Sequence, residues 1–142
     1  MSGVRIYLSV ALIIVATPVF AADDYVLPKG VTVLSEEQLL EQVVGNTISN
    51  DNVTEYYENP SSGEKKGKIK AKYSRGNFGG NWEIKGVLMC FNYDVEYLER
   101  FNDICYSIGV TDSRLDLYNV DGSKFYPGGG PFKLLSGNPE NL

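Results

Sequence analysis

Apolar and polar side chains alternate over short stretches in the second part of the chain, after Gly45. The clearest stretch is Lys68–Tyr73, where Ile69, Ala71 and Tyr73 alternate with three lysines. In an extended strand this spacing places the apolar side chains on one face and the lysines on the other. Similar segments predict strands at Val53–Glu58, Lys68–Tyr73, Trp82–Lys85, Val87–Phe91, Ile104–Ile108, Arg114–Tyr118, Lys124–Tyr126 and Phe132–Leu135.

The order of these segments predicts an all-β protein. About eight short strands, with turn signals every 8 to 12 residues, are typical of an antiparallel sandwich or a small up-and-down barrel. No pattern of helical length separates the strands, which disfavours a parallel sheet. Barrel and sandwich both remain open, and a barrel would be lipocalin-like in outline. Turns are expected at Asn59–Gly63, Gly76–Gly80 and Asp121-Gly122.

One short helix is expected before the strands. Ser35 is followed three positions later by Gln38, which is the capping-box pattern of a helix start. Apolar residues then recur at helical spacing up to Val44, and Gly45 can take the left-handed conformation that ends a helix. The helix is therefore expected over Glu36–Val44, with its apolar side on the open end of the sheet or barrel. The expected core comprises Leu39, Val43, Ile69, Tyr73, Trp82, Ile84, Ile104, Ile108, Leu115 and Leu117.

The first 21 residues have the pattern of a signal peptide. Arg5 precedes an apolar run from Ile6 to Val15, and Val19-Phe20-Ala21 supplies a cleavage site. The run is too short for a spanning helix, which needs roughly 20 apolar residues. We therefore expect residues 22–142 to form a single exported β-rich domain without a membrane anchor, either periplasmic or secreted, in a bacterium.

The two cysteines, Cys90 and Cys105, are expected to form a disulfide bond. An exported chain with an even cysteine count folds in an oxidising compartment, where pairing is the default. Both residues fall in consecutive predicted strands, and antiparallel neighbours would bring them within bonding range. The bond would close the base of the loop Asn92–Asp103 and contribute about 3 kcal/mol.

That loop carries three aromatic residues, Tyr93, Tyr97 and Phe101, among several acids. Tyr97 and Phe101 lie four positions apart, which allows a helical turn. The three rings form either a small apolar cluster beneath the loop or a recognition surface. They are candidate binding residues on the second interpretation.

Acidic residues outnumber basic ones in the chain, and three lysines lie together on one predicted strand. The chain holds 13 basic and 18 acidic residues, for a net charge of −5, which argues against a nucleic-acid partner. Lys68, Lys70 and Lys72 project from one face of their strand. Either acids such as Glu55 and Glu83 pair with them across strands, or the face binds an anionic surface weakly, so these lysines are also candidate binding residues.

Several chemistries lack their residues in this sequence. The chain has no histidine, which removes the usual catalytic triads and the commonest general base. Two thiols without histidine cannot complete a tetrahedral zinc shell, so no metal site and no cofactor is expected. The remaining catalytic hypothesis is a glycan hydrolase of the cell envelope that uses two carboxylates, Asp94 with Glu96 or Glu99 with Asp103.

The order of short motifs resembles that of small exported proteobacterial domains of uncharacterised function. The shared W…C…C…G spacing is carried by Trp82, Cys90, Cys105 and Gly122. The motif order also includes Gly45-Asn46-Thr47, Gly67, Gly86 and Gly137-Asn138. The resemblance implies a bacterial periplasmic protein and transfers no functional residue.

Taken together, the sequence predicts a non-catalytic binding or interaction module rather than an enzyme. Its partner would be an unknown protein or a small apolar ligand. A barrel could carry a lipid-like ligand inside, and a carboxylate-pair hydrolase is the alternative from another class.

Overall fold

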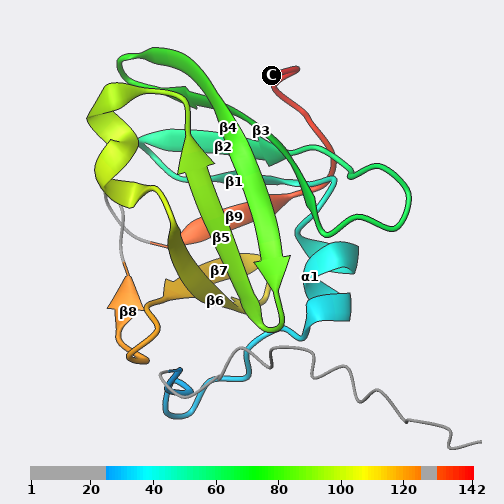
Figure 1. The fold of residues 1–142 in the computed structure, drawn as a ribbon, viewed down its shortest axis with the longest axis vertical. Coiled ribbons are helices and arrows are strands. Elements are labelled where there is room, and N and C mark those ends of the chain that lie inside the picture. The colour runs from blue at the N-terminus through cyan, green and yellow to red at the C-terminus, as the bar shows by residue number, and fades with distance from the viewer. Residues whose placement is uncertain (1–24, 126–130) are drawn as a thin grey trace, which may run out of the picture.

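The computed structural model describes residues 25–125 and 131–142 (Figure 1). The predicted signal peptide at residues 1–21 and Tyr126, at the end of one expected strand, lie outside them. The described elements, in chain order, are α1 (Glu36–Gln42), β1 (Thr47–Ser49), β2 (Val53–Tyr57), β3 (Lys66–Tyr73), β4 (Gly76–Lys85), β5 (Leu88–Tyr93), the 3₁₀ helix η1 (Glu96–Phe101), β6 (Ile104–Thr111), β7 (Arg114–Tyr118), β8 (Lys124–Phe125) and β9 (Phe132–Leu135).

Eight of the described strands close into an antiparallel barrel. Strands β1 to β7 follow one another around the ring, each paired with its neighbours in sequence. Strand β9 closes the ring because it pairs with β1 on one side and with β7 on the other. The short strand β8 forms a hairpin with the end of β7. The expectation of an all-β antiparallel fold is confirmed, and of the two arrangements left open the protein adopts the barrel.

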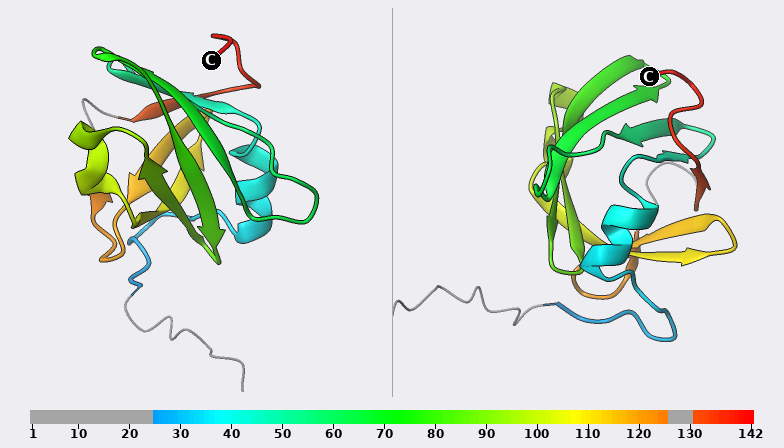
Figure 2. Two further views of the ribbon diagram at one scale, coloured as in Figure 1. Left: turned by 45° about the horizontal axis from the view of Figure 1, so that its top comes forward. Right: turned by 90° about the vertical axis from the view of Figure 1, so that its right-hand side faces the viewer.

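Two helical segments lie at opposite ends of the barrel (Figures 1 and 2). Helix α1 begins with the predicted capping box, in which the Ser35 hydroxyl accepts from the Gln38 backbone and the Gln38 side chain accepts from the Ser35 backbone. Leu39 and Val43 are fully buried, so α1 covers its end with apolar side chains. The other end carries η1, which confirms the helical turn expected between Tyr97 and Phe101.

Strand β3 shows how alternation builds the wall of the barrel. Ile69 and Ala71 are buried and Tyr73 is half-buried, while the lysines between them are exposed. Side chains of adjacent positions point to opposite faces of a strand, so the barrel interior is apolar and its outer face is polar. Of the expected core, Tyr73 and Ile104 are only partly buried and pack against it, whereas the other eight residues are buried.

Two local expectations were wrong, and one short strand was not predicted. Gly76–Gly80 is not a turn but the first half of β4, the longest described strand. Strand β1 had no predicted counterpart. Helix α1 ends at Gln42, two residues earlier than expected, with Val43 as its C-cap, although Gly45 does take the left-handed conformation, with a φ of 76°.

The disulfide expectation is confirmed. Cys90 on β5 and Cys105 on β6 lie directly opposite each other in the sheet register, and their sulfur atoms are bonded. The bond joins neighbouring strands at the base of the loop that contains η1. It therefore fixes the position of η1 at the end of the barrel.

Candidate functional site in the barrel

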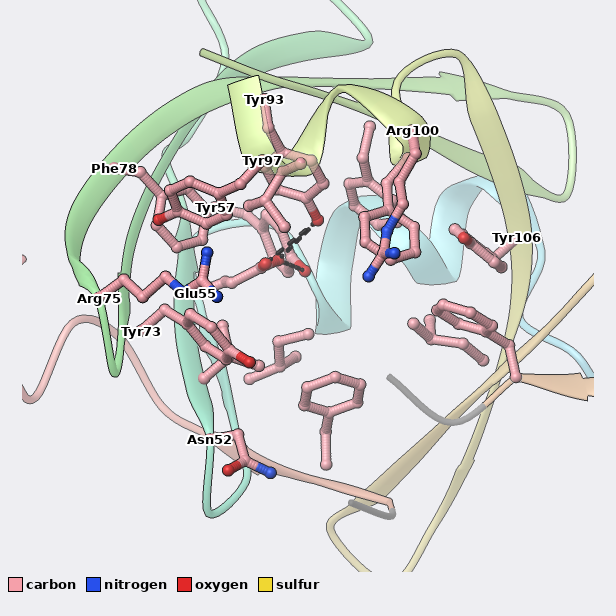
Figure 3. Close-up of a pocket in the computed structure, with 18 residues that line it drawn as sticks. Asn52, Glu55, Tyr57, Tyr73, Arg75, Phe78, Tyr93, Tyr97, Arg100 and Tyr106 are labelled. Atoms are coloured by element: carbon pink, nitrogen blue, oxygen red, sulfur yellow. Dashed lines mark hydrogen bonds between the residues drawn. The ribbon is translucent and has the colours of Figure 1, made fainter. Parts of the chain in front are cut away.

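A cavity of about 320 Å³ lies inside the barrel on the side of η1. Figure 3 draws the 18 residues that line it, most of which are phenylalanine or tyrosine. They come from all eight strands of the ring, from β8, from η1 and from two strand-to-strand turns. The cavity is therefore a property of the closed barrel and not of any one loop.

Strand β2 places a carboxyl group, that of Glu55, in the wall of the cavity. Val53, Glu55 and Tyr57 alternate along it and all three line the cavity. Because the period of a strand is two, a carboxylate between two inward-facing side chains must also face inward. Glu55 is only 7% exposed, so a potentially charged group is buried in an aromatic interior.

Two tyrosine hydroxyl groups donate to the Glu55 carboxylate (Figure 3). The Tyr57 hydroxyl lies 2.9 Å from Oε2. The Tyr93 hydroxyl lies 3.1 Å from Oε1 and 3.4 Å from Oε2. No lysine or arginine within the described part of the chain lies within ion-pair distance of Glu55. A carboxylate offers about four acceptor positions, so it retains the capacity to accept from a ligand.

Burial is the main cause of the shifted pKa values of Glu55 and the tyrosines around it. Loss of hydration raises the pKa of the Glu55 carboxyl above its ordinary value of 4.5, and the hydrogen bonds from Tyr57 and Tyr93 oppose that rise. Burial, with the nearby Glu55 charge, raises the pKa of Tyr57 and Tyr93 well above 10. The same two causes raise the pKa of Tyr106 to about 12. All three phenols are therefore protonated at neutral pH and can act as hydrogen-bond donors.

Two arginines stand at the mouth of the cavity. Arg75 comes from the turn between β3 and β4, and Arg100 comes from η1. Both residues are exposed, and Figure 3 shows their guanidinium groups directed toward the cavity. Arg75 lies 5.5 Å from the centre of the Tyr97 ring, and Arg100 lies 4.8 Å from that of Phe101. Neither has an ion-pair partner among residues 25–125 and 131–142.

The loop around η1 is held to the barrel by an asparagine as well as by the disulfide. The Asn102 side chain accepts from the Tyr93 backbone N–H at 2.6 Å and donates to the Tyr93 carbonyl at 3.2 Å. The backbone of Asp103 then donates to the Phe91 carbonyl at 3.1 Å. These hydrogen bonds hold the loop against β5 and β6, so that residues of η1 line the cavity.

The structure brings the three predicted aromatic residues together in this cavity, although Tyr93 is the last residue of β5 and not part of the loop. Tyr93, Tyr97 and Phe101 all line it, and Tyr93 also packs against the apolar core. The Tyr93 side chain reaches into the cavity, where its hydroxyl donates to Glu55. Tyr97 lies at the rim and is 36% exposed. The sequence identified these residues by their unusual density of aromatic rings in a polar loop.

The three lysines lie elsewhere, on the outer face of β3. Lys70 forms an ion pair with Glu58 at 2.7 Å, and Lys72 lies 3.9 Å from Glu140. Lys68 donates to the Asn81 side chain at 2.8 Å. The expected partners were wrong, because Glu55 points into the barrel and the carboxylate of Glu83 pairs with Lys85 at 3.1 Å.

The carboxylates of the hydrolase hypothesis do not line the cavity. Asp94, Glu96, Glu99 and Asp103 are all exposed. The acid that does line it, Glu55, was expected on the outer face. The signal that could have found it is the alternation of Val53, Glu55 and Tyr57, which contradicts the general preference of glutamate for the surface.

No family model, curated protein or solved structure matches the chain. The described residues contain no group of three or more potential metal-ligating side chains. None of the helices in the described ranges is long and apolar enough to cross a membrane.

Proposed function

We propose that this protein is a non-catalytic module that binds one small, largely apolar ligand inside its barrel. The observation that carries the proposal is the aromatic cavity, whose described lining residues include one buried carboxylate, that of Glu55. Its volume of about 320 Å³ lies within the roughly 300–1,000 Å³ of small-molecule sites. Such sites combine apolar walls with a few polar groups that orient the ligand, as Glu55 and its tyrosines would do here.

The proposed place of action is the periplasm or the extracellular space. The disulfide between Cys90 and Cys105 is the kind of bond that persists in oxidising compartments. The signal-peptide pattern of residues 1–21 supports the same location. In this proposal the mature domain meets its ligand outside the cytoplasm.

Binding of a neutral apolar fluorophore, N-phenyl-1-naphthylamine, tests the proposal. The dye gains fluorescence when it leaves water for an apolar site, and we expect saturable binding of one dye per protein. The variant Val53→Trp adds bulk to the cavity wall and should reduce dye binding at least tenfold. Native mass spectrometry of the protein purified from its source should also show a bound small molecule.

A matched control separates the cavity from the surface. Val120 is 44% exposed and does not line the cavity, so Val120→Trp adds the same side chain outside it. Circular dichroism and a thermal melt establish that both variants fold. If Val120→Trp weakens the dye as much as Val53→Trp does, or if the wild type binds no dye, the proposal is wrong.

A further inference from the structure

The cavity carries charged groups of opposite sign at its inner end and at its mouth, although most of its wall is aromatic. Its interior carries the carboxylate of Glu55, which is buried and lacks a cationic partner in the described structure. Its mouth carries the guanidinium groups of Arg75 and Arg100, which are exposed. Most of the residues that line the cavity around these groups are aromatic (Figure 3).

We propose that the ligand is dipolar, with an ammonium group that binds Glu55 and an anionic group that binds Arg75 and Arg100. This inference rests on the proposed function, because it names the chemical class of ligand that the same cavity takes. An apolar or aromatic body joins the two ends of that ligand.

The inner end fits an ammonium group for two independent reasons. A buried carboxylate is costly to leave without a positive partner, and a charged N–H donor would compensate it with a charge-assisted hydrogen bond. The Phe91 ring packs against the rings of Tyr57, Tyr93 and Tyr106 with centroids 5.8 to 6.4 Å apart, so the carboxylate lies in an aromatic cluster. The faces of aromatic rings attract cations, most strongly where water is excluded.

The outer end fits a carboxylate or a phosphate. Arginine presents a rigid fork of donors that matches the oxygens of such anions. Each of the two guanidinium groups already lies over an aromatic ring, Tyr97 for Arg75 and Phe101 for Arg100. Stacking of this kind limits the freedom of a side chain, so less entropy is lost when the anion binds.

The two charged ends also weaken the binding of ligands that lack one or both charges, without excluding them from the apolar cavity. An amine without an anionic group would have to pass two uncompensated arginines at the mouth. An acid without an amine would leave Glu55 buried against an apolar group. A ligand with both charges satisfies both ends, so each charge should contribute to affinity only when it meets its own partner.

A set of four probes with one benzene body tests this inference. The dipolar probe is 4-(2-aminoethyl)benzoate, its methyl ester keeps only the ammonium group, 4-ethylbenzoate keeps only the carboxylate, and methyl 4-ethylbenzoate has neither charge. Their affinities are measured by displacement of N-phenyl-1-naphthylamine and by calorimetry. The dipolar probe should bind at least about tenfold more tightly than each singly charged probe, as expected for one charge-assisted hydrogen bond.

Three variants assign each gain to its residue. Glu55→Gln should abolish the advantage given by the ammonium group while keeping that of the carboxylate. Arg75→Gln combined with Arg100→Gln should do the reverse. Lys72→Gln removes a positive charge from the outer face of β3 and should leave all four affinities unchanged.

The outcomes separate this inference from the proposed function. If the dye binds in the cavity but the dipolar probe has no advantage over its methyl ester and 4-ethylbenzoate, the inference is wrong and the barrel binds another class of small molecule. If charge-dependent binding persists in both Glu55→Gln and the arginine double variant, the residues are wrongly assigned. If neither the dye nor any probe binds, the proposed function fails as well.

Discussion

The hydrogen bond from Tyr57 to Glu55 makes a quantitative prediction about stability and pH. The variant Tyr57→Phe keeps the buried ring and its stacking on Phe91, at 5.8 Å between centroids, and removes only the hydroxyl. That hydroxyl donates to Oε2 across 2.9 Å. Its loss should cost about 1.5–3 kcal/mol when Glu55 is ionised and about 0.5–1.5 kcal/mol when it is protonated.

The sign of the pH dependence follows from the raised pKa of Glu55. Below the ordinary value of 4.5 the carboxyl is protonated in the folded and the unfolded protein. As the pH rises toward the raised pKa, the unfolded chain loses its proton first, so the folded protein loses stability relative to it. Removal of one donor raises that pKa further and so enlarges the total loss of stability. The penalty of Tyr57→Phe should therefore grow as the pH rises from 4 to 8.

Thermal unfolding followed by circular dichroism measures this penalty. For a domain of this size, 1 kcal/mol corresponds to about 3–6 °C in Tm. The control is Tyr106→Phe, which also removes a hydroxyl from the cavity, but one that makes no hydrogen bond with another described residue. In a protein that also carries Glu55→Gln, the penalty of Tyr57→Phe should no longer depend on pH. A penalty that is independent of pH, or equal in the two tyrosine variants, would refute the role given to Glu55.

Two further predictions concern the disulfide and the outer face of β3. Combined replacement of Cys90 and Cys105 by alanine should lower the free energy of unfolding by about 2–5 kcal/mol. An unchanged denaturant midpoint would contradict it, as would two free thiols in the denatured, unreduced protein. Combined replacement of Lys68, Lys70 and Lys72 by glutamine should leave retention on anionic liposomes unchanged, because these lysines already have polar or acidic neighbours. Salt-sensitive retention of the wild type that the variant loses would show a binding surface instead.

Sequence patterns predict the parts of this fold in which buried positions hold apolar residues, exposed positions hold polar ones, and capping and pairing depend on nearby residues. The Lys68–Tyr73 pattern, the capping box at Ser35 and the pairing of the two cysteines all depend on neighbours in sequence or on one partner strand. These elements appear in the structure nearly as expected. The choice between barrel and sandwich depends on how the last strand meets the first, which no local pattern contains.

The parts that the sequence did not predict depend on long-range packing. Gly80 is typical of turns, yet it lies inside β4, where an added Cβ would come within 2.4 Å of the Asn92 carbonyl oxygen. The glycine is needed because β4 and β5 approach closely there. Glu55 follows the alternation of its strand against its own preference for water. The two mouth arginines come from separate loops, so only the closed barrel shows that they share one site.

The position of β9 has a consequence for the order of folding. Strands β1 to β7 can pair as each emerges from its turn, but β1 gains its second neighbour only from the last strand. The Thr47 hydroxyl donates to the Gly137 carbonyl at 2.6 Å across 90 positions of the chain, and the Gly137 N–H donates to the Asn46 side chain. Contacts so distant in sequence form slowly because a long loop must close first. We therefore expect β9 to pair late in folding, and until it does the edge of β1 and the Arg114–Leu115 end of β7 are open to pairing with other chains.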